Sequence, residues 1–179
     1  IEYRKNCASG GIGAALAEWC VSNGGVAYGV TYNECFLPVF YGAKDKQEIE
    51  NFKGSKYVQA STGDIFNDVK KSLCKASTPV VFFGTPCQIA GLYNVVGKDH
   101  KNLITVELLC HGVSPERYFF EELDYIVQDR KIKHFDNVSF RTNQYLLDFN
   151  FVLWNKGKPV FVQDSHTNEY FESFLSGLS

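Results

Sequence analysis

The chain has 179 residues, of which 45% are hydrophobic, 21% charged and 15% aromatic. This length and balance are typical of a folded protein of one ordinary domain, or at most two small ones, and exclude a disordered chain. The 18 basic and 20 acidic side chains give a formal net charge of −2, which argues against a basic nucleic-acid-binding protein. No apolar run approaches the roughly 20 residues of a membrane-spanning helix, and the first residues lack the apolar core of a secretory signal.

The chain contains six cysteines and no methionine, not even at the first position. The cysteines lie at positions 7, 20, 35, 74, 87 and 110, without a C-x-x-C pair. A chain of this size without a secretory signal does not need disulfide bonds, so we expect reduced or metal-bound cysteines in a cytoplasmic protein. Cys20 and Cys35 fall on apolar segments, which predicts that both are buried in the core. The missing methionine leads us to expect a segment of a longer chain.

The first third of the chain predicts a helix followed by two strands. Residues 26–32 and 36–41 read as strands around a turn at 33–34, and a short charged helix follows over 44–52. The first helix covers residues 12–20. Its apolar side chains have the spacing of one buried face, formed by Ile12, Ala15, Leu16, Trp19 and Cys20.

The middle of the chain predicts a strand–helix–strand unit. Residues 79–83 are uncharged strand formers, which is typical of a strand covered on both faces. Residues 89–94 read as the helix and 103–109 as the second, parallel strand. An amphipathic helix over 64–73 precedes this unit, with Asp64 as its N-cap. The buried face of that helix is predicted to be Ile65, Val69 and Leu73.

The last third changes its pattern. A long helix opens with Ser114 as N-cap and Pro115 as the first helical residue. Its core face is predicted to be Phe119, Phe120, Leu123, Ile126 and Val127. Short alternating segments at 138–140, 149–154 and 160–162 then indicate an antiparallel hairpin or meander, before a last helix at 168–175. We therefore predict a mixed α/β fold, with a βαβ-containing sheet flanked by helices and an antiparallel C-terminal third.

Two cysteines follow the strands of the predicted βαβ unit. Cys87 lies three residues after Gly84, which ends the first strand, and Cys110 directly follows the second strand. Both strands end at the same edge of the sheet, where open α/β sheets bind ligands. Two interpretations are open: the cysteines are half of an iron–sulfur site, which normally takes four thiolates, or they are small buried hydrophobic residues.

Two helix starts have backbone N–H groups that can hold a phosphate or the edge of a flavin. The first consists of Gly84, Thr85 and Pro86, and the second of Ser9, Gly10 and Gly11. Neither has the spacing of a Walker loop or of a dinucleotide fingerprint, so a plain helix start is the alternative for each.

Three further residues are candidates for a cofactor site. Lys56 and Tyr57 place a cation and an aromatic ring beside a flexible glycine, with a solvated loop lysine as the alternative. His111 can donate to a cofactor or bind a metal, and the alternative is a histidine held by nearby backbone.

Five segments of the chain match family motifs in order along the sequence. They are ASGG at 8–11, GSKYVQ at 54–59, GTPCQIAGL at 84–92, LCHGV at 109–113 and VSFR at 138–141. In these segments, and over nearly the whole chain, the sequence resembles the coenzyme F420 hydrogenase/dehydrogenase beta subunit family. Five matches in the family's order are more specific than any one of them.

The resemblance implies an oxidoreductase subunit that contains FAD and a 4Fe–4S cluster. Such a subunit passes electrons between iron–sulfur carriers and a two-electron acceptor, which in some members is the deazaflavin coenzyme F420. By position, the resemblance implies that Cys87 and Cys110 are cluster ligands. It implies that the flavin faces Ser9, Gly10, Gly11, Lys56, Tyr57, Gly84 and Thr85. Two further candidates for cofactor binding are Pro86, in the helix start at 84–86, and His111, which can donate to a cofactor.

The resemblance also implies how the chain is organised. Residues 1–179 would form a single domain cut from a longer chain, with a flavin-binding core at 1–130 and an antiparallel extension at 131–179. Two departures matter. The segment 7–9, which reads CAS, stands where relatives often have a run of serines. Relatives also continue past Ser179 into a C-x-x-C segment that would complete the cluster. The expected partner is a ferredoxin domain or a hydrogenase or dehydrogenase subunit, with no nucleic acid and no membrane span.

Two functions of other classes compete with the redox enzyme. One is a non-catalytic cofactor-binding or docking subunit of a redox complex. The other is a zinc or structural module that uses Cys87, Cys110 and His111, which is disfavoured because a fourth ligand is not evident.

Overall fold

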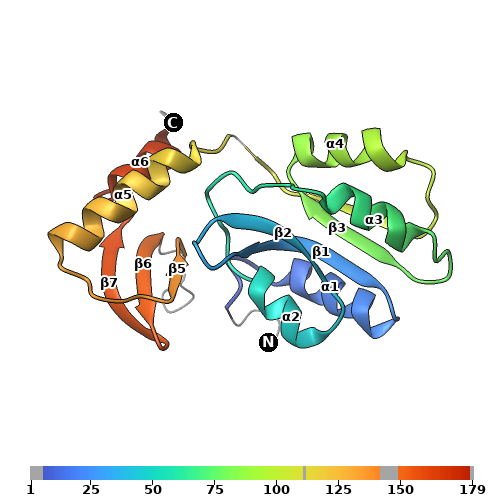
Figure 1. Cartoon of the computed structure of the whole chain (residues 1–179), viewed down its shortest axis with the longest axis horizontal. Coiled ribbons are helices and arrows are strands. Elements are labelled where there is room, and N and C mark those ends of the chain that lie inside the picture. The colour runs from blue at the N-terminus through green and yellow to red at the C-terminus, as the bar shows by residue number, and fades with distance from the viewer. Residues whose placement is uncertain (1–5, 111, 142–148, 178–179) are drawn as a thin grey trace. The chain divides into compact units, whose positions relative to one another are not determined.

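The computed structural model describes residues 6–110, 112–141 and 149–177. It confirms the mixed α/β fold, with one four-stranded sheet in the N-terminal part and one three-stranded antiparallel sheet in the C-terminal part (Figure 1). The described chain forms two compact units. The first unit contains residues 9–53 and 60–110, and the second contains the other described residues.

The first unit is built around the four-stranded sheet. Its elements in chain order are α1 (Ile12–Ser22), β1 (Val26–Tyr32), β2 (Pro38–Ala43), α2 (Lys46–Ile49), a 3-10 turn (Glu50–Phe52), α3 (Ile65–Leu73), β3 (Val80–Gly84), α4 (Pro86–Val96) and β4 (Leu103–Glu107). The strand order is β2-β1-β3-β4, with β1, β3 and β4 parallel and β2 antiparallel to β1. Both the first hairpin and the βαβ unit are therefore confirmed.

Strand β3 is covered on both faces, as its uncharged sequence predicts. Val80 and Phe82 point into a cluster with α3 and α4. Val81 points to the opposite face and into a second cluster, which includes Ala17 and Cys20 of α1. Helix α3 also buries its predicted face, formed by Ile65, Val69 and Leu73.

The predicted buried face of α1 is correct for Cys20 and wrong for Ile12 and Trp19. Ala17 and Cys20 face the sheet and are buried, whereas Ile12 and Trp19 are 72% and 46% exposed. The Cys20 thiol donates to the carbonyl oxygen of Pro79 at 3.3 Å, which is possible because small side chains let the helix approach the sheet closely. Glu18 is the single charged residue of the helix, so apolar periodicity does not choose between its faces.

One helix start differs from the prediction, and another is confirmed in position but has a different hydrogen bond. Helix α4 begins at Pro86 and not at Ile89, because the Gln88 side chain accepts the Thr85 N–H at 2.9 Å and stabilises an earlier turn. Asp64 occupies the N-cap position of α3, but its carboxylate accepts from the Asn67 side chain and not from a backbone amide.

The predicted N-cap of α5 and the predicted burial of Cys35 are both wrong. Pro115 is the N-cap of α5, because buried Ser114 is held in a β-bridge with Val58, far away in the sequence. Cys35 is exposed and not in the core, since it lies in the turn where the Asn33 side chain accepts its N–H.

The second unit contains the antiparallel meander that the sequence predicts. Its elements are α5 (Glu116–Asp129), β5 (Asn137–Ser139), β6 (Asn150–Asn155), β7 (Lys158–Asp164) and α6 (Glu169–Ser176). The strand order is β5-β6-β7, and both pairings are antiparallel. Asn168 caps α6 by accepting the Phe171 N–H at 2.9 Å.

The core of the second unit is aromatic. Phe119, Phe140, Tyr170 and Phe171 are each 0% exposed, and the Phe140 and Phe171 ring centroids lie 5.4 Å apart. The Tyr170 hydroxyl donates to the carbonyl oxygen of Tyr57 at 2.7 Å. Burial raises the pKa of Tyr170 above its usual value, which keeps the hydroxyl protonated as the donor. The segment 54–59 is thereby anchored in this unit.

Candidate functional site

The carboxyl edge of the parallel strands carries the two cysteines singled out from the sequence. Gly84 at the end of β3 pairs with Glu107 at the end of β4. Cys87 and Cys110 each follow one member of this pair by three residues, and both are exposed. Exposure removes the alternative that they are buried hydrophobic residues. Each thiol lies where a ligand at this edge can reach it.

The local geometry of Cys87 is well defined. It is the second residue of α4, and its sulfur lies 3.2 Å from the hydroxyl oxygen of Thr85. No disulfide joins any two of the six cysteines, all of which are among the described residues. The described residues also contain no group of three or more histidine, cysteine, aspartate or glutamate side chains placed to hold a metal. Cys87 and Cys110 therefore supply at most two of the four thiolates that a 4Fe–4S cluster takes.

The turn at residues 84–86 offers few donors to an anion. Pro86 has no N–H, and the Thr85 N–H is already bound by the Gln88 side chain. A Cβ at Gly84 would lie 2.8 Å from the Phe82 ring, so this glycine is required for packing. The cofactor-binding roles of Gly84, Thr85 and Pro86 stay predictions.

The start of α1 lies at the same edge of the sheet. Gly13, in its first turn, contacts the ring of Phe83 near the end of β3, since an added Cβ would lie 3.6 Å from that ring. Cys20, in its last turn, contacts Pro79 at the start of β3. Helix α1 therefore runs antiparallel to β3, and its N-terminus lies at the carboxyl edge that also carries Cys87.

The N-terminus of α1 is better suited to an anion than that of α4. No side chain caps α1, and the N-cap residue Gly11 has the left-handed conformation, with φ of 86°. Ser9 and Gly10 are exposed, and a Cβ at Gly10 would meet no atom within 4 Å. The first amides of α1 are therefore approachable, and the helix dipole favours negative charge there. The sequence alone does not separate these two helix starts.

Lys56 lies in the second unit, on the segment anchored by Tyr170. Its side chain is half-buried, and its ammonium group donates to the carbonyl oxygen of Gly54 at 3.3 Å. Burial lowers the pKa of Lys56 to about 8, because the charged form loses solvation. The side chain is still mostly protonated at neutral pH. Such a partly desolvated cation interacts strongly with an anionic group.

The ring of Tyr57 belongs to the aromatic core of the second unit. Its centroid lies 4.6 Å from that of Phe174 and 5.4 Å from that of Phe171. These contacts give Tyr57 a packing role, and its predicted contact with the flavin stays a prediction. His111, the remaining candidate, lies outside the described residues.

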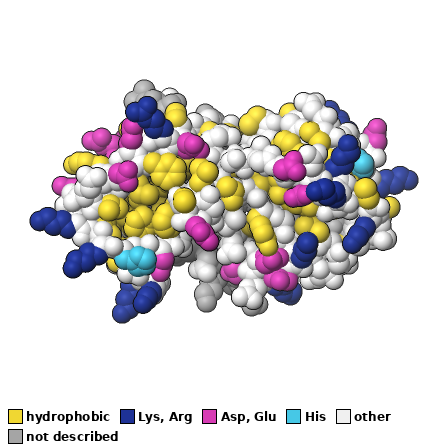
Figure 2. All heavy atoms as spheres, viewed as in Figure 1, with side chains coloured by type: hydrophobic (Ala, Val, Ile, Leu, Met, Phe, Trp, Pro, Cys, Tyr) yellow, Lys and Arg dark blue, Asp and Glu magenta, His cyan; other side chains and the backbone are white. Residues whose placement is uncertain are grey.

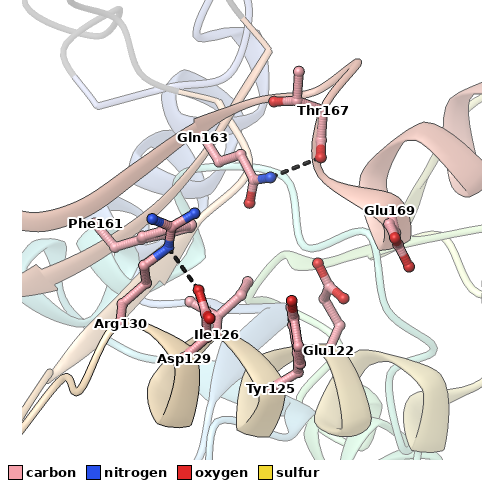
Figure 3. Close-up of a pocket in the computed structure, with 9 residues that line it drawn as sticks. All are labelled: Glu122, Tyr125, Ile126, Asp129, Arg130, Phe161, Gln163, Thr167 and Glu169. Atoms are coloured by element: carbon pink, nitrogen blue, oxygen red, sulfur yellow. Dashed lines mark hydrogen bonds and ion pairs between the residues drawn. The ribbon is translucent and has the colours of Figure 1, made fainter.

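A small polar pocket in the second unit was not anticipated from the sequence (Figure 3). It has a volume of about 150 Å³ and lies among α5, β7 and the start of α6. Glu122 and Glu169 line it from the two helices, and the pKa of Glu122 is raised by burial and, less, by the charge of Glu169. Binding sites for drug-sized ligands measure about 300–1,000 Å³, so this pocket is too small for a flavin.

The surface shows a mixture of charges. On the face drawn in Figure 2, lysine and arginine side chains are interspersed with aspartate and glutamate and do not form one basic patch. None of the helices among the described residues is both long enough and apolar enough to cross a membrane.

Comparisons with known proteins find similarity among solved structures. No protein-family model and no curated protein matches the chain. Among solved structures, the chain is similar to a chain of the F420-reducing NiFe hydrogenase complex from Methanosarcina barkeri, in a xenon-derivatised structure, with 18% identity and a TM-score of 0.56. The match covers 91% of this chain and 56% of that chain, so this chain spans little more than half of its neighbour's length. At this identity the likeness shows a shared fold.

Proposed function

We propose that this chain is part of a flavin- and iron–sulfur-dependent oxidoreductase subunit, which passes electrons between iron–sulfur carriers and a two-electron acceptor. The observation that carries the proposal is the pair Cys87 and Cys110, two exposed thiols that follow paired residues at one edge of a parallel sheet. The fold shared with a chain of an F420-reducing hydrogenase complex supports it. A bound flavin would supply the conversion between one-electron and two-electron chemistry.

The residues at this edge have distinct proposed roles. The first amides of α1, preceded by Ser9, Gly10 and Gly11, bind the anionic phosphates of the flavin. Cys87 and Cys110 ligate the cluster as thiolates, with two further ligands supplied by residues beyond those described. Coenzyme F420 is a candidate acceptor because the neighbouring hydrogenase complex reduces it.

The proposal is tested with the full-length protein purified without oxygen. We expect flavin absorption bands with a broad iron–sulfur shoulder, and about four iron and four sulfide per chain for one 4Fe–4S cluster. Cys87→Ser and Cys110→Ser should each lose most of this iron and sulfide. Cys35→Ser is the matched control, because Cys35 is also exposed but lies in a turn of the β1–β2 hairpin. It should retain the full content.

Two results would contradict the proposal. A colourless protein that carries zinc would favour the structural-module alternative. Full iron and sulfide content in both the Cys87→Ser and Cys110→Ser proteins would remove these cysteines from the cluster, whatever the flavin content.

A further inference from the structure

The two outer edges of the four-stranded sheet differ. The outer edge of β2 is covered, because the Ser61 N–H donates to the carbonyl oxygen of Pro38 at 2.9 Å and the Phe40 N–H donates to that of Ser61 at 3.3 Å. In the part of the chain that the structure describes, no strand pairs with the outer edge of β4. Proteins usually protect such an edge, because its unpaired backbone groups can bind another strand.

The backbone of β4 shows which groups face outward. The Val80 N–H donates to the carbonyl oxygen of Asn102 at 2.8 Å, and the Leu108 N–H donates to that of Gly84 at 2.9 Å. Backbone groups alternate in direction along a strand, so the even-numbered residues of β4 bond to β3. The N–H groups of Thr105 and Glu107 therefore point away from the sheet.

The side chains of this strand do little to block pairing. The segment 103–109 reads LITVELL and contains one charge and no proline or glycine. Ile104 is 38% exposed and Leu108 is 50% exposed. An open edge with one charge and no proline is a site where another strand can add to the sheet.

We propose that β4 pairs antiparallel with β4 of a second copy of this chain, about a two-fold axis at Ile104. This register places Lys101 of each copy opposite Glu107 of the other and brings the two Ile104 side chains together. Both charged residues are exposed in the single chain. A two-fold axis makes every contact occur twice, so one favourable pair becomes two.

The charges select this register. In an antiparallel ladder, two residues lie directly opposite each other only if their backbone N–H and C=O groups both face the partner strand or both face away from it. An odd-numbered residue of β4 therefore cannot lie opposite an even-numbered one. The two-fold axis must then pass through a residue and not between two residues. An axis at Thr105 would place Glu107 opposite Leu103, and an axis at Val106 would place it opposite Thr105. Only the axis at Ile104 places Glu107 opposite a basic residue, Lys101, which lies in the turn just before β4. That complementarity identifies a second copy as the partner.

The pairing would join two sheets into one continuous sheet of eight strands, twice the four of one chain. Because the two sheets would run in opposite directions, their carboxyl edges would lie on opposite sides. The cysteine-bearing edge of each copy therefore stays accessible, and the assembly does not depend on the proposed redox function.

The first test measures the mass of the full-length protein by sedimentation velocity across a concentration series. We expect a dimer, and we expect Thr105→Pro to weaken it at least ten-fold, because proline removes an N–H that points away from β3. Thr105→Val is the matched control: it keeps that N–H but, like proline, loses the hydroxyl contact with Tyr93. It should dimerise as the parent does. A monomer at about 100 μM, or a dimer unaffected by proline, would overturn the proposal.

The second test addresses the register and does not depend on the folding of the proline variant. Lys101→Glu and Glu107→Lys should each weaken the dimer about ten-fold, since each puts like charges opposite one another at two places. The double variant restores both pairs and should dimerise as the parent does. Circular dichroism melts check that all variants fold. Single variants that dimerise normally, or a double variant no better than the singles, would overturn the pairing.

Discussion

Lys56 couples the stability of the protein to pH. Burial lowers its pKa from an ordinary value of 10.5 to about 8, so the folded chain binds fewer protons than the unfolded chain between these values. The contribution of Lys56 to the unfolding free energy therefore rises as pH increases from about 8 to about 10.5. The size of the pKa shift limits this pH-dependent contribution of Lys56 to the unfolding free energy to about 3 kcal/mol. Partial exposure of the side chain makes the contribution smaller.

This pH dependence is measured by urea unfolding at pH 7 and at pH 10. Lys56→Met removes the titrating group, so the gain in stability of the parent relative to this variant should appear between the two pH values. Lys75→Met is the control, because Lys75 is exposed. An equal pH dependence in the parent and in Lys56→Met would show that burial of this amine has no effect on stability.

Helix α1 depends on close contact with the start of β3. A Cβ at Gly25 would lie 2.0 Å from the carbonyl oxygen of Pro79, which also accepts the Val26 N–H and the Cys20 thiol. Backbone cannot move there without breaking these bonds. We expect Gly25→Ala to lower the unfolding free energy by about 3 kcal/mol.

Gly13, inside α1, provides the contrast to Gly25, which lies between α1 and β1. At Gly13 the added Cβ would make an ordinary contact with Phe83, and alanine favours helix over glycine by about 1 kcal/mol. Gly13→Ala should therefore leave stability unchanged or raise it. Urea unfolding of both variants tests the pair, and a similar loss in both would show that the packing of α1 against β3 is not what makes Gly25 necessary.

The two compact units have separate cores, one around β3 that mixes aliphatic and aromatic side chains and one aromatic around Phe140. Phe140→Ala removes a fully buried ring that contacts Phe151 and Phe171, at an expected cost of about 3–5 kcal/mol. Because these contacts lie within the second unit, hydrogen exchange should accelerate in α5, β6 and α6 more than in β1 and β3. Equal acceleration throughout the chain would indicate that the two units unfold together.

Several elements could be predicted because a local pattern has one solution. The face of α3 is unambiguous, since charged residues occupy its other sides. The uncharged run of β3 has to be buried on both faces, and the alternation after residue 137 fits only antiparallel strands. The positions of Cys87 and Cys110 follow from the same logic, because parallel strands end at one edge.

Other features depend on contacts between residues far apart in the sequence. The buried face of α1 is set by the fit of Ala17 and Cys20 against β3, since apolar spacing alone also allowed the exposed face of Ile12 and Trp19. The anchoring of residues 54–59 in the second unit depends on a hydrogen bond to Tyr170, which no local spacing encodes. The sequence by itself determined the elements and the sheet edge that carries the cysteines. Only the tertiary structure decided which helix start stays uncapped and which strand edge stays open, because both depend on what the rest of the chain covers.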